Sequence, residues 1–296
     1  MLAYIVTIVL YAVQFGVSFV LFGSAIAALN KQGRGPFTWP VLISFCLGCG
    51  LLLKLVRVTS LRHHKNNWGQ GLVILEVLGT MFVNFADIFW VAAAFHLWQH
   101  RRRVLHANHP RHTRSTALFM WSMVFLMAAL NLVGTIASLV EIRKLVKSLN
   151  RANTIVSLDP RNGLLIAGTA WVATVIIWVL SLLTAIIASQ ILYWQTRSSR
   201  DKVTRVLAWG VAPLFVIRLV WLISRAVFLN YGSRSYNVDG LGLFFNEMPT
   251  LIVLVLYLYL GLSNRNLDMW SLPKRNQPTN QYVQLNNQSD VLLAKA

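Results

Sequence analysis

Seven runs of mostly apolar residues, each long enough to cross a lipid bilayer as a helix, follow one another along this chain. A membrane-spanning helix needs about 20 such residues. Because the hydrocarbon core offers no partner to an unpaired backbone group, these runs predict an all-α fold, a polytopic bundle of seven transmembrane helices within residues 1–262. The expected spans are residues 2–29, 37–60, 71–98, 115–140, 163–194, 206–230 and 241–262.

The composition excludes a soluble globular domain. Apolar residues make up 56% of the chain, and the charged residues stand in short islands between the apolar runs. A net charge of +18 would indicate a nucleic-acid partner in a soluble protein. In a membrane protein, basic loops instead set the orientation and contact anionic lipids, so membrane lipids are expected partners and nucleic acid is not.

The loop charges predict the orientation of the bundle. Fifteen Lys and Arg residues lie in the first, third and fifth loops and the tail, against eleven on the opposite side. Because cytosolic loops carry the excess of positive charge, we expect the amino terminus outside and the carboxyl terminus in the cytosol. The first run, Leu2–Leu29, lacks a basic flank and is longer than the apolar core of a signal peptide, which predicts a retained membrane helix.

The third run, Gly71–Trp98, carries two acids on one face. At 100° per residue Glu76 and Asp87 share a stripe with Thr80, and Asn84 lies beside it. An ionised carboxylate near the bilayer centre costs about 2.5–3.5 kcal/mol, so the stripe predicts partners, water or protonation. A structural pair between helices and a ligand or ion site both fit this pattern.

Residue counting predicts a partner for the deeper acid. At about 1.5 Å per residue, Arg218 in the sixth run lies at the depth of Asp87 in the third. Since an unpaired arginine in lipid is costly, we expect these two side chains to pair inside the bundle. Trp221, one turn from Arg218, is the expected aromatic wall of the site.

A second charged layer is expected nearer the outer surface. Lys54, Arg57 and Arg225 lie near the outer ends of their runs, at the level of Glu76 and close to that of Glu247. We expect Arg225 to pair with Glu247 or Glu76. The two layers together predict a charged pocket in the outer half of the bundle.

The seventh run combines polar residues with a proline. Asn246 and Glu247 stand just before Pro249, which removes a backbone hydrogen bond and permits a kink. A kink beside ionisable groups suits a site that binds a ligand and shifts, although prolines without such a role also occur in membrane helices.

Neither a metal nor a cofactor is expected. Cys46 and Cys49 form a C-x-x-C pair inside an apolar run, where a redox or zinc site would lack polar surroundings and further ligands, so we interpret them as helix-packing residues. His106, His109 and His112 recur every third residue in the most basic loop, but no acid or cysteine completes a metal shell. That loop suits orientation, anionic headgroups or a cytosolic partner.

An enzyme is not expected. Intramembrane hydrolases need paired aspartates, a serine–histidine pair or several histidines within the spans. Only one membrane-embedded aspartate, Asp87, and one histidine at the border of a span, His96, are present.

Two polar segments complete the chain. The loop of residues 141–162 is expected to begin as a short interfacial helix, since Leu145 and Leu149 share a face among basic residues. Residues 263–296, rich in Asn and Gln, are expected to form a disordered cytosolic tail. In it, Tyr282 and Leu285 fit a tyrosine-based sorting signal read by adaptor proteins, or a chance match.

The last two spans carry a family resemblance. The sixth has an arginine followed by an aromatic, Arg218 and Trp221, and the seventh has an acid shortly before a proline, Glu247 and Pro249. In these residues and in its layout the chain resembles eukaryotic orphan seven-pass families: the plant tobamovirus-multiplication-type proteins and their animal orphan-receptor relatives, or the fungal lipid-translocating exporter-like proteins. The acid–arginine–aromatic triplet of rhodopsin-like receptors and a lysine in the seventh span are both absent from the sequence.

The expected function is that of a receptor-like integral membrane protein with a charged intramembrane pocket. A transporter or exporter of lipids or small solutes, using the same charges, is the alternative. The plasma membrane or an endolysosomal or vacuolar membrane is the expected location. The candidate pocket residues are Glu76, Asp87, Arg218, Trp221, Arg225, Asn246 and Glu247.

Overall fold

The computed structural model describes residues 2–29, 38–63, 70–105, 113–150, 161–195, 205–230, 241 and 243–262, and all of these are helical. The elements are α1 (Leu2–Leu29), α2 (Thr38–His63), α3 (Gln70–Leu105), α4 (Thr113–Asn150), α5 (Arg161–Gln195), η3 (Leu207–Val211), α7 (Ala212–Asn230), η4 (Leu243–Glu247) and α9 (Met248–Leu262). The short segments η3 and η4 are π-helical and lead directly into α7 and α9. The all-α prediction is confirmed for the described part of the chain.

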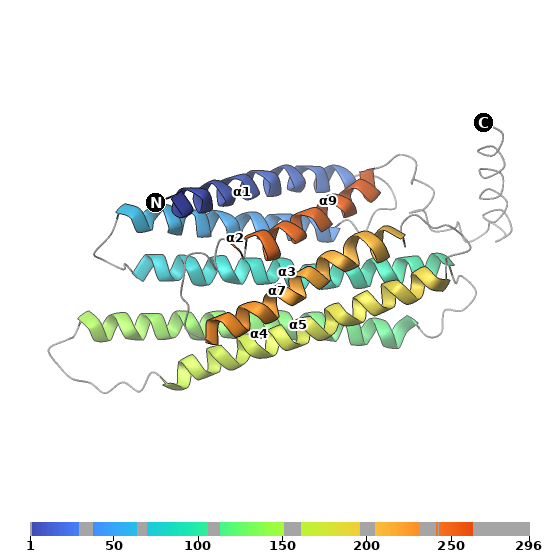
Figure 1. Ribbon diagram of the computed structural model, residues 1–296. Coiled ribbons are helices and arrows are strands. Elements are labelled where there is room, and N and C mark those ends of the chain that lie inside the picture. The colour runs from blue at the N-terminus through green and yellow to red at the C-terminus, as the bar shows by residue number, and fades with distance from the viewer. Residues whose placement is uncertain are drawn as a thin grey trace.

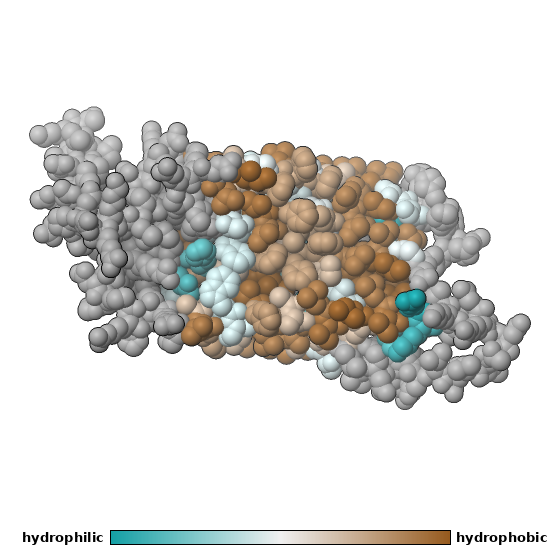
Figure 2. Space-filling model, turned by 180° about the vertical axis from the view of Figure 1, so that it is seen from behind, coloured by the Kyte–Doolittle hydropathy of each residue, from teal (hydrophilic) through white to brown (hydrophobic). Residues whose placement is uncertain are grey.

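Among the described residues, five helices are long and apolar enough to cross a membrane. They cover Ile5–Leu29, Thr38–Ser60, Gly71–Gln99, Ala117–Lys144 and Ala167–Ile191. Two shorter apolar segments follow, Leu207–Trp221 and Phe244–Leu260. The helices α1, α2, α3, α4, α5, α7 and α9 run in alternating directions along one bundle (Figure 1). Figure 2 shows a broad apolar belt across one face, bordered at both ends by less hydrophobic residues, which is the surface of a membrane protein that lipid covers.

The start of the loop expected over residues 141–162 differs from the sequence expectation. A short helix was expected there and is present, but it belongs to α4, which continues without a break through Asn150. This stretch contains no glycine or proline and is rich in Leu, Lys and Arg, so nothing in its sequence ends the helix. In the same way α3 continues past Trp98 to Leu105.

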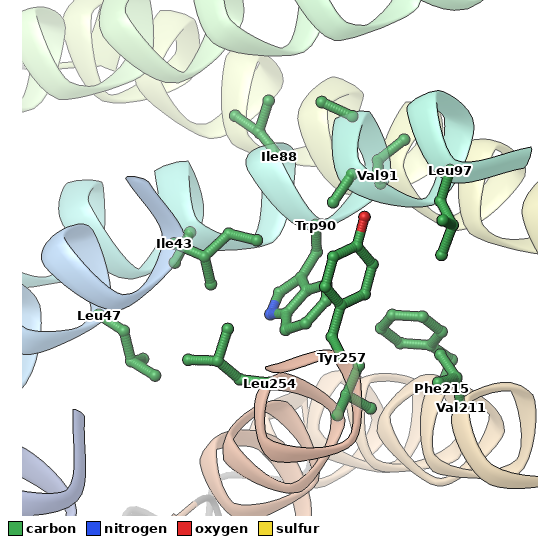
Figure 3. Packing of buried hydrophobic residues seen from close by; sticks show 14 of the residues in the cluster. Ile43, Leu47, Ile88, Trp90, Val91, Leu97, Val211, Phe215, Leu254 and Tyr257 are labelled. Carbon is green, nitrogen blue, oxygen red and sulfur yellow. The ribbon is translucent and has the colours of Figure 1, made fainter. Parts of the chain in front are cut away.

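Helix α3 lies at the centre of the bundle and packs against α2, α4 and α5. Its fully buried Ala92 and Ala93 allow neighbouring helices to approach closely. Trp90 of α3 meets Phe215 of α7 and Tyr257 of α9 edge to face, with ring centroids 6.1 Å apart in both pairs (Figure 3). These aromatic contacts hold three elements together in the core.

Helices α2 and α3 cross at two glycines. A Cβ atom on Gly50 would lie 2.9 Å from the carbonyl oxygen of Gly79 and 2.8 Å from Cγ2 of Val83. A Cβ on Gly79 would lie 3.3 Å from the carbonyl oxygen of Gly50 and 3.2 Å from Cγ of Lys54. Only residues without a side chain permit this approach of two backbones, and the crossing brings Lys54 against α3.

Both π-helical turns end two residues before a proline. Pro213 follows η3 and Pro249 follows η4 at this spacing. Proline has no N–H group, and its ring clashes with the carbonyl four residues earlier, so the turn before it widens. The kink expected at Pro249 therefore takes the form of a π-helical turn.

A side chain from α5 compensates for the widened turn of η3. There the N–H of Ala212 donates to the carbonyl of Leu207, five residues back, which leaves the carbonyl of Ala208 without its α-helical donor. Gln190 donates from Nε2 to this Ala208 carbonyl at 3.0 Å. The interhelical bond offsets the cost of a backbone acceptor in a lipid-like interior.

We expect Gln190→Leu to lower the free energy of unfolding by about 1 kcal/mol, because it leaves the Ala208 carbonyl without this donor. Unfolding of the purified protein in mixed detergent micelles measures the change. The matched control is Ser189→Ala, since the Ser189 hydroxyl only donates to the carbonyl of Ala185 in its own helix. Equal effects of the two substitutions would contradict the compensating role of Gln190.

Candidate functional site

The deepest charged contact joins three elements at the middle of the bundle. Nη2 of Arg218 on α7 donates to Oδ1 of Asp87 on α3 at 2.5 Å. Nε and Nη2 of the same guanidinium donate to Oδ1 of Asn246 on η4, at 3.2 and 3.0 Å. The Arg218 side chain is only 1% exposed. The pairing of Asp87 with Arg218 expected from their depth is therefore present.

One aromatic ring contacts the guanidinium, and it is not the one expected. The central carbon of the Arg218 guanidinium lies 5.3 Å from the ring centroid of Trp178 on α5, a cation–π contact. Trp221, expected as the wall, stacks on Phe245 of η4 at 5.5 Å instead. Trp178 stands at the midpoint of α5, so depth counting applied to α5 would have placed it beside Asp87 and Arg218.

Two further ion pairs lie between this contact and one end of the bundle. Nζ of Lys54 lies 3.3 Å from Oε1 of Glu247, and Nη1 of Arg57 lies 2.6 Å from Oε2 of Glu76. The two acids are thus in contact with bases of α2. The Arg225 side chain, expected to pair with one of these acids, lies outside the described side chains.

The three pairs form a row in which the outermost pair is the most exposed: Arg57 and Glu76 are 27% and 38% exposed, whereas Lys54 and Glu247 are 16% and 6% exposed. We call the pairs Arg57–Glu76, Lys54–Glu247 and Asp87–Arg218 the charged row. Glu76 is 38% exposed and Asp87 18%, and they are separated by about 16 Å along α3. Acids and bases balance one to one within the row. It leads from the more exposed end of the bundle to its middle without adding net charge.

An apolar layer closes the bundle beyond the charged row. Trp90 follows Asp87 by one helical turn on α3, and Phe215 precedes Arg218 by one turn on α7. Because the two helices run in opposite directions, both aromatic residues lie on the same side of the Asp87–Arg218 pair. These two side chains pack with Leu254 and Tyr257 of α9, and all are buried (Figure 3). We call these four residues the apolar plug. Polar groups can therefore approach the Asp87–Arg218 pair more readily from the end that carries Glu76.

Other features lie apart from the charged row. A hollow of about 440 Å³ on α5 is lined by Gly168, Thr169, Val172, Ala173 and Ile176, so no charged residue of the row borders it. Among the described residues no group of three or more His, Cys, Asp or Glu side chains is arranged to hold a metal ion. Neither cysteine of the C-x-x-C pair forms a disulfide.

Polar contacts also occur between helices away from this site. Nε1 of Trp39 donates to Nδ1 of His96 at 2.9 Å, which ties the start of α2 to the later part of α3. Nδ2 of Asn84 donates to Oδ1 of Asn131 at 3.3 Å and joins α3 to α4. Interhelical contacts of this kind support packing in membrane proteins. Asn84, expected beside the acidic stripe, therefore points to α4. The sorting residues Tyr282 and Leu285 lie outside the described residues.

No protein-family model, no curated protein and no solved structure matches this chain. The resemblance to orphan seven-pass and lipid-exporter-like families therefore stays a prediction, and the function must be inferred from the geometry of the charged row.

Proposed function

We propose that the protein is a non-enzymatic, receptor-like, seven-pass integral membrane protein that binds a ligand at the inner end of the charged row. The observation that carries this proposal is the buried contact of Arg218 with Asp87 and Asn246, which joins α3, α7 and η4. A ligand that touches this contact interacts with three elements at once, so it can favour one arrangement of the helices over another.

The charges of the loops support an orientation for this site. With the amino terminus outside, the end of the bundle that carries Glu76 faces the outer aqueous phase. We propose that η3 with α7 and η4 with α9 complete the seven spans. The inner loops and the tail then contact a cytosolic signalling or adaptor protein, in a plasma, endolysosomal or vacuolar membrane.

A transporter of lipids or small solutes is the second candidate. It is favoured by the π-helical turns η3 and η4, because interrupted helices next to a mid-membrane site are a feature of transporters. These turns lie in the two elements that carry Arg218 and Asn246. In a transporter the apolar plug would open to the inner side, whereas in a receptor it would stay closed.

Thiol labelling tests the outward-facing site. Thr80 lies on the stripe between Glu76 and Asp87 and is half-buried. In a background in which Cys46 and Cys49 are alanine, we expect Thr80→Cys to react with a membrane-impermeant thiol reagent added to intact cells. Val91→Cys, beside the apolar plug and fully buried, should not react. Labelling of Thr80→Cys only from the inner side would reverse the orientation, and labelling from neither side would refute the site.

A further inference from the structure

Two buried N–H donors beside Asp87 have no acceptor among the described residues. They are Nη1 of Arg218 and Nε1 of Trp178. The two side chains are 1% and 5% exposed, and they stack on one another, so both donors belong to one small region. An unmet buried donor costs about 1–3 kcal/mol, and more when it is charged. This region is therefore suited to receive an acceptor from outside the chain.

The charges around the region decide what that acceptor can be. Asp87 faces Arg218 of α7, while Lys54 of α2 and Glu247 of η4 pair with each other. Helix α1 carries no charged residue, and α4 and α5 carry none at this depth. The low dielectric at mid-bundle permits little net charge. An anion added to the ionised Asp87–Arg218 pair would leave one net negative charge there.

Protonation of Asp87 removes this obstacle. With a neutral Asp87, Arg218 carries one uncompensated positive charge, and one monovalent anion restores neutrality. Asp87 is also the more accessible partner, since its side chain is 18% exposed and that of Arg218 is 1% exposed. A proton can therefore reach its carboxylate from the more exposed end of the charged row.

We propose that a small monovalent anion, a halide or a short carboxylate, binds to Arg218 and Trp178 together with one proton on Asp87. This inference rests on the proposed ligand site and names its ligand class. The only covalent change is the new O–H bond on the Asp87 carboxyl group, formed with a proton from the outer aqueous phase. Both the free and the loaded site are neutral, so each anion binds with one proton.

One proton per anion fixes the pH dependence of binding. Where Asp87 is ionised in the free protein, the apparent Kd should fall about tenfold for each unit by which the pH is lowered. Between about pH 8 and about pH 6 the affinity should therefore rise about 100-fold.

Anion titration of the full chain in nanodiscs of uncharged lipid tests this coupling. Sodium chloride and sodium acetate are titrated separately at the two pH values, with sodium sulfate, whose anion is divalent, keeping the ionic strength constant. Thermal stabilisation reports binding, and a pH-sensitive dye in weakly buffered solution counts the protons taken up. Stabilisation by chloride alone assigns a halide site, and stabilisation by acetate identifies a carboxylate ligand.

Three variants separate the roles of the residues. Asp87→Asn replaces the carboxyl group with an amide that is neutral at every pH, like the protonated form of Asp87. We therefore expect anion binding without proton uptake and with an affinity independent of pH. Trp178→Phe keeps an aromatic ring at this position but removes the N–H donor, so the affinity for the anion should fall about tenfold. Glu141→Gln is the control, because Glu141 pairs with Lys144 away from the charged row, and it should keep the full pH dependence.

The proposal is overturned if neither anion stabilises the wild-type protein at either pH, in which case water fills the region. It is also overturned if anions bind without proton uptake, or if Asp87→Asn retains the pH dependence. Should Asp87→Asn not fold, the ratio of protons to anions in the wild-type protein still decides. Outer labelling of Thr80→Cys without any anion effect would leave the proposed ligand site standing and remove only this inference.

Discussion

Replacing Arg218 with leucine is expected to lower the free energy of unfolding by about 3–5 kcal/mol, because Asp87 is then left in the bundle without its partner. Asp87→Leu should be similarly harmful, since it leaves a guanidinium that is only 1% exposed with Asn246 as its remaining polar contact. The double substitution removes both desolvation costs and should recover most of the stability. Unfolding in mixed detergent micelles, followed by helical circular dichroism, measures all three.

A pair with one exposed partner provides the control for this cycle. Lys144 lies 2.8 Å from Glu141 near the end of α4, and its side chain is 53% exposed while that of Glu141 is 8% exposed. Because water reaches the pair through Lys144, Lys144→Leu should lower the free energy of unfolding by less than Arg218→Leu. A double mutant of Asp87 and Arg218 that is no more stable than the worse single mutant would contradict the contact between them.

The same double mutant separates a structural role from a functional one. If the pair only holds α3 and α7 together, the double mutant should be stable and keep the anion-dependent stabilisation of the native protein. If the pair binds the ligand, the double mutant should be stable but insensitive to anions. We expect the second result.

Gly50→Ala is expected to lower the free energy of unfolding by about 1–3 kcal/mol, because the added methyl group collides with the backbone of α3. The nearest rigid atom is the carbonyl oxygen of Gly79, 2.9 Å from the new Cβ, so α2 and α3 must separate. That separation also moves Lys54 away from Gly79 of α3. The same unfolding measurement reports the effect.

Gly16→Ala is the matched control for this substitution. Gly16 lies in the interior of α1, and a Cβ atom there meets nothing within 4 Å. Alanine has the higher helix propensity, so Gly16→Ala should be neutral or stabilising by up to about 1 kcal/mol. If Gly50→Ala lowers the free energy of unfolding no more than Gly16→Ala does, the backbones of α2 and α3 are not in close contact.

The sequence was sufficient to predict the all-α fold and its deepest charged contact. In apolar runs of membrane length, the backbone groups can form their hydrogen bonds within a helix. The constant rise per residue of that helix converts a sequence position into a depth in the membrane. Asp87 stands at the centre of α3 and Arg218 at the centre of the expected span 206–230, and a buried charge needs a partner, so depth alone was enough to pair them.

Depth could not decide among several partners at one level. Lys54, Arg57 and Arg225 were expected near the same height, and the contacts of Glu247 and Glu76 with Lys54 and Arg57 depend on how α2 crosses α3. That crossing follows from the approach of two glycines, which residue counting does not reveal. Trp178 was missed for a different reason: the only charged residue of α5 is Arg161 at its first position, so depth counting was not applied to this helix.

A density map of the protein in lipid nanodiscs with chloride at about pH 6 tests the buried charged site most directly. We expect Arg218 in contact with Asp87 or Asn246, enclosed by α3, α5, α7 and η4, with non-protein density beside its Nη1 atom and Nε1 of Trp178. A map in which the Arg218 side chain points to lipid would contradict the proposed ligand site. A map in which only protein atoms surround its guanidinium would contradict the binding of an anion there.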